Sequence, residues 1–153
     1  MATTSDHILG AQELIAAFGY WPSFHDAEVH WIHVDRQACP KRFGPTLEAM
    51  IHTFEITKDV DADGNLVLRH HVLDHFRFHD VVEMIIEEFN HQNVLNGLRI
   101  VDLSEQQLED IRFGVSFDSS FGVNASFKCR AIEIVSVEPC NKAGEPAQTN
   151  RKN

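Results

Sequence analysis

Apolar residues near the N-terminus recur at the spacing of one face of a helix: Ile8, Leu9, Leu14, Ile15 and Phe18. Ser5 or Asp6 can cap this segment and Gly19 can end it, so the pattern predicts a helix over residues 7–18. Its apolar face requires a covering surface, and we expect the helix to pack on a sheet.

Farther along the chain the hydrophobic period falls towards two, which is typical of strands. The pattern predicts strands at residues 27–35, 46–57, 66–79, 94–103, 111–118 and 121–137. Residues 81–89 fit both a helix and a strand, and the turn-like residues 90–93 that follow favour a strand. In the 66–79 segment the even positions are largely apolar and the odd positions mostly polar, which predicts one core face and one wet face.

These elements add up to an α+β fold, in which the N-terminal helix packs on a mostly antiparallel sheet of six or seven strands. The length of 153 residues suits one hydrophobic core, so we assign residues 1–138 to a single domain. Residues 139–153 have few apolar side chains, and we predict a disordered polar tail there.

The charge balance narrows the classes of partner. The chain has 23 acidic and 13 basic residues, a net charge of −10, which argues against a nucleic-acid surface and suits a basic protein partner better. Nine acidic and two basic residues fall within residues 74–110, either as a solvated face or as a binding surface. We find no signal sequence, no apolar run long enough for a membrane span and no metal or redox spacing among the three cysteines, and we expect a cytoplasmic protein.

Several segments carry residues with possible chemistry, but none predicts a catalytic site or a cofactor. Residues 59–64 match half of a calcium-binding loop, yet His70 stands where the bidentate glutamate should be, so a hairpin turn is the favoured interpretation. Histidines repeat every fourth residue at 71, 75 and 79, but on a strand this spacing spans about 13 Å, too far for one ion. A metal site that recruits His25 and Asp26 to these histidines stays open as an alternative.

Residues 19–29 combine three aromatic side chains, a proline, a histidine and carboxylates between the predicted helix and the first strand. Two interpretations are open. The segment is a structural latch, in which Trp21 and Phe24 plug the end of the core and Asp26 binds backbone amides, or it is a binding surface. Residues 89–94 pose the same question, because their amide side chains serve either a turn or a polar recognition surface.

Taken together, the segments 18–29 (FGYWPSFHDAEV) and 89–95 (FNHQNVL) resemble the immunity protein 50 family of bacterial polymorphic toxin systems. The resemblance runs from about residue 9 to residue 137. It implies an α+β fold and a cytoplasmic protein that neutralises a toxin delivered by neighbouring cells or made by its own cell. No catalytic residues come with it.

An acidic chain of this kind can inhibit a toxin by stoichiometric binding, and its carboxylates could mimic a phosphate-bearing substrate if the toxin is a nuclease. The partner-binding residues predicted on these grounds are Trp21, Phe24, His25, Asp26, Asp80, Glu83, Glu87, Glu88, Asn90, Gln92 and Asn93. A metal-binding module or metal-dependent enzyme and a homo-oligomer that associates through aromatic side chains are the alternatives.

Overall fold

Eight strands form one antiparallel sheet in the order β4-β7-β6-β5-β1-β2-β3-β8. The computed structural model describes residues 4–37, 44–109 and 111–147. The strand bounds are β1 Glu28–Asp35, β2 Thr46–Val60, β3 Leu66–His79, β4 Val82–Glu87, β5 Val94–Asp102, β6 Phe113–Phe121, β7 Asn124–Cys129 and β8 Ala131–Pro139. The predicted α+β class and antiparallel sheet are confirmed, and residues 81–89 do contain a strand.

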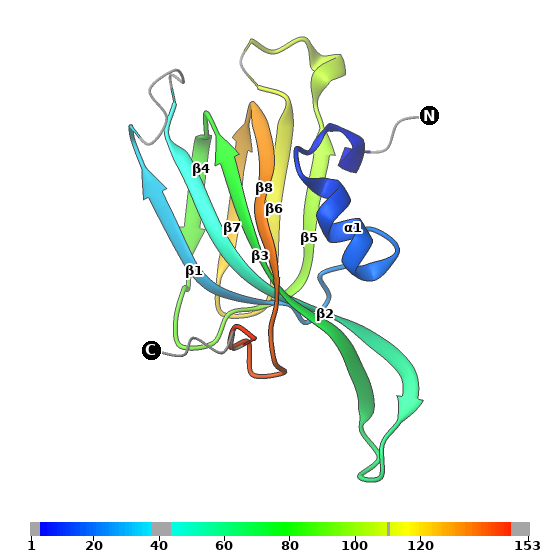
Figure 1. The fold of residues 1–153 in the computed structure, drawn as a ribbon. Helices are drawn as coiled ribbons and strands as arrows, with labels where there is room; N and C mark the ends of the chain where they lie inside the picture. The colour runs from blue at the N-terminus through cyan, green and yellow to red at the C-terminus, as the bar shows by residue number, and fades with distance from the viewer. Residues whose placement is uncertain (1–3, 38–43, 110, 148–153) are drawn as a thin grey trace, which may run out of the picture.

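The sheet folds over so that β1-β2-β3-β8 lies in front of β5-β6-β7-β4 (Figure 1). Phenylalanines from both layers meet between them. The ring of Phe78 on β3 lies 6.2 Å from that of Phe117 on β6 and 4.9 Å from that of Phe127 on β7. All three side chains are buried, so the core is the space between the two layers.

The sheet has eight strands rather than the expected six or seven. The extra strand arises because residues 121–137 form two strands rather than one. The chain bends at Arg130 and passes from β7 in one layer to β8 in the other. The Arg130 amide donates to the carbonyl of His79, where the chain also changes layer between β3 and β4. No glycine or proline marks this bend, so the sequence carries no turn signal there.

The N-terminal helix is shorter than expected. Helix α1 spans Ala11–Phe18, after a 3-10 turn at Thr4–His7. Leu9 instead extends the sheet, since its amide donates to the Ile132 carbonyl and its carbonyl accepts from the Ile134 amide. The predicted cap at Ser5 or Asp6 is therefore wrong, whereas Gly19 does end the helix, with its amide bonded to the Ile15 carbonyl.

Strands β2 and β3 run past the rest of the sheet as a protruding hairpin, residues 55–69, which we call the arm (Figure 1). The predicted tight turn is confirmed: the Asp61 amide donates to the Asn65 carbonyl at 2.8 Å. Asp61 Oδ1 also accepts from the amides of Asp63 and Asn65. The predicted core face of β3 holds for Val72, Phe76 and Phe78 but fails for Leu66 and Leu68, which are exposed on the arm.

After β8 the chain forms a turn over residues 140–147, closed by a bridge between Cys140 and Pro146. Gly144 is the buried residue of this turn and lies against the imidazoles of His30 and His52. Residues 148–153 lie outside the described part of the chain, and the boundary of the domain at residue 138 stays a prediction.

Candidate functional site

The two segments that stand out in the sequence meet in the structure, and we call their junction the seam. The Asp26 amide donates to the Leu95 carbonyl at 2.9 Å, and the Leu95 amide donates to the Ala27 carbonyl at 2.8 Å. The Val29 amide reaches the Asn93 carbonyl at 2.8 Å. The seam thus joins β1 to β5, where one layer of the folded sheet continues into the other.

Asn93 organises the seam from inside. Its side chain is almost fully buried, and its Oδ1 accepts from the amides of Asn90 at 3.0 Å and Val123 at 3.1 Å. Its Nδ2 donates to the carbonyls of Asn90 and Val29. Gly122 lies directly over it, and a Cβ there would come 2.8 Å from Asn93 Oδ1 and 2.2 Å from the Gln92 carbonyl oxygen. This side chain serves the loop geometry, as the turn interpretation expected.

The aromatics of the first segment pack inward. Phe24 is buried and its ring lies 5.7 Å from that of Trp21 and 5.9 Å from that of Phe76 on β3. Trp21 is half-buried and also contacts Phe76 edge-on. These contacts fit the structural-latch interpretation for Trp21 and Phe24 and leave little of Phe24 for a partner to touch.

His25 and Asp26 are the predicted site residues of this segment whose side chains are exposed to solvent. Their side chains are 52% and 50% exposed, and His25 Nε2 lies 3.8 Å from Asp26 Oδ1. His25 Nδ1 lies 3.3 Å from the Asn96 carbonyl oxygen. Ser23 Oγ accepts from the backbone amide of His25 rather than from its imidazole, so no nucleophile–base pair forms here.

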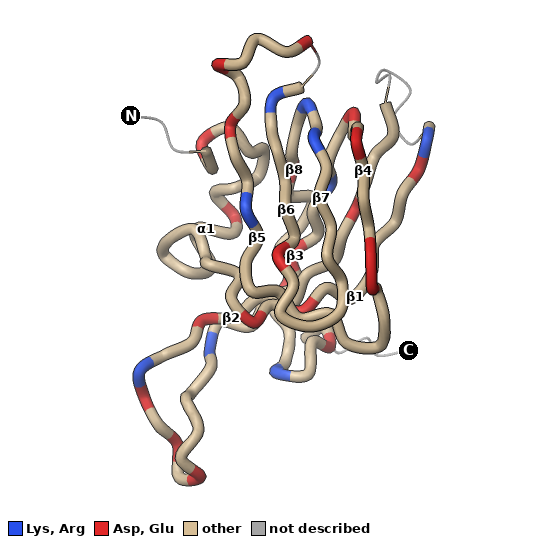
Figure 2. Tube along the Cα trace, turned by 180° about the vertical axis from the view of Figure 1, so that it is seen from behind, with Lys and Arg blue, Asp and Glu red and all other residues tan. Residues whose placement is uncertain are grey.

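The predicted acidic residues separate into exposed and buried members. Glu83, Glu87 and Glu88 are exposed on β4 and the loop that follows it (Figure 2). Glu83 pairs with Lys128 at 2.8 Å, whereas among the described residues no ion pair includes Glu87 or Glu88. Asp80 is buried, and its Oδ1 accepts a hydrogen bond from the Gly44 amide at 2.8 Å. This is a structural contact at the point where the chain passes from β3 in one layer to β4 in the other. Asn90 and Gln92 are exposed beside Glu88.

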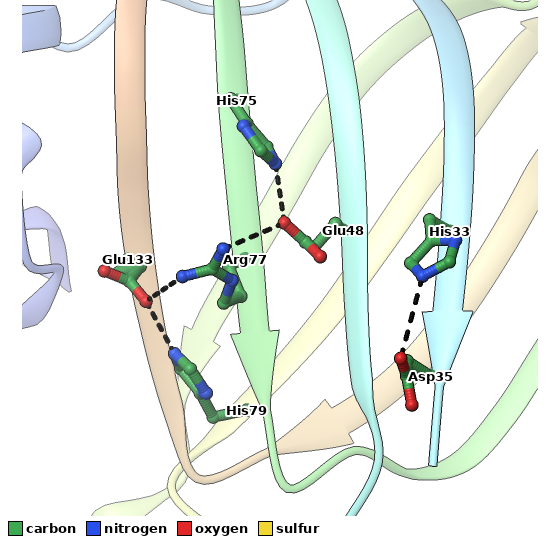
Figure 3. Close-up of polar contacts among 7 residues, drawn as sticks. All are labelled: His33, Asp35, Glu48, His75, Arg77, His79 and Glu133. Atoms are coloured by element: carbon green, nitrogen blue, oxygen red, sulfur yellow. Dashed lines mark hydrogen bonds and ion pairs between the residues drawn. The ribbon is translucent and has the colours of Figure 1, made fainter. Parts of the chain in front are cut away.

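Two of the repeated histidines, His75 and His79, lie on β3 in an ionic network (Figure 3). His75 Nε2 donates to Glu48 at 2.7 Å and His79 Nε2 donates to Glu133 at 2.8 Å. Arg77 links the two carboxylates at 3.2 Å each. Burial acts to raise the pKa of Glu133, but the hydrogen bonds from His79 and Arg77 outweigh it and hold that pKa below its usual value.

A second group of imidazoles lies where the arm joins the sheet. His52 Nε2 and His71 Nδ1 are 2.9 Å apart, and the His30 ring is 6.0 Å from that of His52. Burial, with the nearby His71 and His30, lowers the pKa of His52 to about 4. Within residues 4–37, 44–109 and 111–147, no three His, Cys, Asp or Glu side chains are placed to hold a metal ion.

The arm is the surface that the sequence interpretation missed. Ile56 pairs with Leu68 and Val60 with Leu66 across its two strands, and all four side chains are exposed. Their alternation in the sequence is that of an ordinary core face. The signal that could have found them is length: 15 and 14 residues in β2 and β3 against at most 9 in any other strand.

A family model described as immunity protein 50 matches residues 10–140, from the residue before α1 to the residue after β8. The chain belongs to this family. The match includes the seam, the acidic strand β4 and the arm. No curated protein and no solved structure matches this immunity protein 50 chain. None of the helices in its described residues has the length and apolar character needed to cross a membrane.

Proposed function

We propose that this protein neutralises a cognate bacterial toxin by stoichiometric protein–protein binding in the cytoplasm, without catalysis of its own. The observation that carries the proposal is the immunity protein 50 match, which spans the complete folded sheet. A cognate toxin is what membership of an immunity protein family implies as partner.

The exposed members of the predicted site form the proposed contact surface. Glu87 and Glu88 are exposed, at the C-terminal end of β4 and directly after it. This end of β4 and the arm lie towards the same end of the sheet, on opposite sides of it (Figures 1 and 2). Exposed carboxylates without internal partners speed association with a basic protein and set its orientation. Glu83, Asn90, Gln92, His25, Asp26 and the exposed part of Trp21 complete this surface.

The buried members of the prediction have a different part in the proposal. Phe24, Asp80 and Asn93 are buried, so we propose that they hold the surface in shape without touching the toxin. A basic active-site cleft, such as that of a nuclease, is the partner chemistry that the exposed carboxylates suit. The alternative of a metal-binding module lacks support, because no three His, Cys, Asp or Glu side chains in the described part of the chain are placed to hold a metal ion.

The test is a titration of a candidate cognate toxin domain with this protein. Its activity should fall linearly with added protein and reach zero at one equivalent, and co-expression should restore growth of a bacterial host. Complete protection at far below one equivalent would contradict stoichiometric binding and indicate an enzyme. Unchanged toxicity at several equivalents would remove the proposal.

The contact surface has a charge-matched control. Glu87→Gln with Glu88→Gln and Glu105→Gln with Glu109→Gln remove two exposed carboxylates each, from different places on the chain. We expect roughly a tenfold loss of affinity for the first pair and less than about a twofold loss for the second, measured by calorimetry. Equal losses would show that net charge alone matters.

A further inference from the structure

The arm presents a stripe of exposed apolar side chains on one face. Leu66 and Leu68 are two residues apart on β3 and so share a face, and their cross-strand partners Val60 and Ile56 lie on that face too. The exposed fractions are 62% for Val60, 52% for Leu66, 41% for Leu68 and 36% for Ile56. Four adjacent apolar side chains in water are a feature of interaction sites, unlike single scattered ones.

A two-stranded hairpin alone is marginally stable in water, so a protruding arm needs something to hold its direction. Contacts at its base provide this. Arg69 binds both carboxylate oxygens of Glu55, at 3.2 and 3.3 Å, and His70 Nε2 lies 3.3 Å from Glu55 Oε2. The Tyr20 hydroxyl also interacts with the Glu55 carboxylate, and the Phe18 ring packs between those of Tyr20 and His70.

These basal contacts tie the arm to the end of α1 and the start of the first sequence segment. The hydrogen bonds from Arg69 hold the pKa of Glu55 below its usual value, so the carboxylate stays charged. The arm therefore leaves the sheet in a fixed direction with its apolar face uncovered. Such preorganisation lowers the entropic cost of binding.

The tip of the arm is acidic. Asp59, Asp61 and Asp63 lie there with a single cation, Lys58 (Figure 2). The Asp61 carboxylate is used by the turn itself, whereas Asp59 and Asp63 accept no hydrogen bond that fixes the turn. The chain as a whole has a net charge of −10, so a second copy is repelled and a basic partner is attracted.

We propose that the arm is a docking element that inserts its apolar stripe and acidic tip into a basic, apolar-walled cleft of the toxin. This inference rests on the proposed binding of a toxin. The stripe supplies affinity by leaving water, and the carboxylates of Asp59 and Asp63 supply orientation. The arm and the C-terminal end of β4, which carries Glu87, lie towards the same end of the sheet but on opposite sides of it, so the arm is a contact separate from the β4 carboxylates (Figures 1 and 2).

The experiment uses the full chain and a catalytically inactivated form of the toxin domain that it neutralises in the titration above, with affinity measured by calorimetry. Val60→Thr with Leu66→Thr keeps strand-forming side chains and removes apolar surface. We expect it to weaken binding roughly tenfold or more. Val101→Thr with Val135→Thr, at exposed positions outside the arm, is the matched control and should stay within about twofold.

The tip is tested separately. Asp59→Asn with Asp63→Asn should slow association roughly threefold to tenfold and flatten its dependence on salt, while Asp61 is left intact to preserve the turn. The circular dichroism spectrum and the thermal midpoint of each variant confirm that it is folded.

The outcomes separate this inference from the function on which it rests. No binding by the wild type overturns both. Full affinity in the arm variant, with loss in Glu87→Gln/Glu88→Gln, overturns the arm alone. A wild type that sediments as a dimer and an arm variant that sediments as a monomer would assign the stripe to a second copy and also overturn the inference.

Discussion

Asn93 in the seam and Val60 in the arm both belong to antiparallel backbone pairs, but their surroundings differ in every respect. Asn93 is 3% exposed and its side chain binds backbone groups of Asn90, Val29 and Val123. Val60 is 62% exposed, and the structure shows it with one cross-strand neighbour, Leu66.

This difference shows that residues that stand out in the sequence and residues that form an exposed surface can be different ones. The unusual residues, an aromatic-rich segment and an amide-rich loop, largely fix how one layer of the sheet joins the other. The ordinary residues, valine and leucine in regular alternation, form the surface that most lacks a covering layer. A sequence segment can therefore be distinctive because of the fold it stabilises, while the contact surface beside it has an unremarkable pattern.

The largest expected effect compares two glycines with the same backbone conformation. Gly122 in the seam has φ 81° and a Cβ there would clash with the Gln92 carbonyl oxygen at 2.2 Å. Gly64 at the arm tip has φ 82° and nothing within 4 Å of that position. We expect Gly122→Ala to lower the free energy of unfolding by about 4 kcal/mol, because backbone strain and the clash add up. Gly64→Ala should lower it by about 1 kcal/mol, from backbone strain alone.

Urea unfolding of both variants measures these free energies. Equal losses would mean that the loop over Asn93 yields easily and that the seam is no more rigid than the arm.

The next effect removes the centre of the seam. Asn93→Ala leaves the amides of Asn90 and Val123 without their acceptor, and each buried unpaired donor costs roughly 1–3 kcal/mol. We expect a total loss of about 3 kcal/mol in free energy of unfolding. Asn65→Ala in the arm turn, where the backbone carbonyl makes the contact to Asp61, is the matched control, with an expected loss below about 0.5 kcal/mol.

A loss in Asn93→Ala no larger than that in the control would show that water replaces the amide, and would weaken the structural role assigned to it. Hydrogen exchange at the Val123 amide gives an independent measure, because it should accelerate in this variant alone.

The sequence sufficed for those elements whose signals are local. Hydrophobic alternation located most of the strands, Gly19 ended the helix, and residues 61–65 predicted the turn of the arm. It failed where the cause lies elsewhere in the chain. Leu9 prefers pairing with β8 over helix formation, and the bend at Arg130 depends on the carbonyl of His79, which no local pattern reveals.

The candidate site divides in the same way. Sequence patterns singled out residues 19–29 and 89–94, but only three-dimensional pairing shows that they meet at Asp26 and Leu95. Burial then separates Asn93 from its exposed neighbour Gln92, although both carry amides. The exposure of Leu66 and Leu68 depends on where the neighbouring strands end, which a period of two does not encode.

The smallest effect concerns Asp74, at the junction between the arm and the sheet. Burial raises the pKa of Asp74 to about 7, although the hydrogen bond from Thr53 at 2.6 Å acts to lower it. The folded protein thus binds this proton more tightly than the unfolded chain does, so the stability it contributes at low pH is lost as pH rises towards and through 7. Between pH 5 and pH 8 we expect this loss to be roughly 2–3 kcal/mol.

Asp74→Asn removes the titration and keeps an acceptor for Thr53. The difference in unfolding free energy between this variant and wild type should therefore shift by roughly 2–3 kcal/mol in favour of the variant from pH 5 to pH 8. The difference is the right quantity, because the lowered pKa of His52 changes the stability of both proteins in the opposite direction, with stability lost as pH falls from about 6.5 towards 4. Asp63→Asn, the same substitution at the exposed arm tip, is the control. If the two variants gave parallel pH profiles, the junction would be as hydrated as the arm, and the boundary between rigid sheet and exposed arm would have to move inward past residue 74.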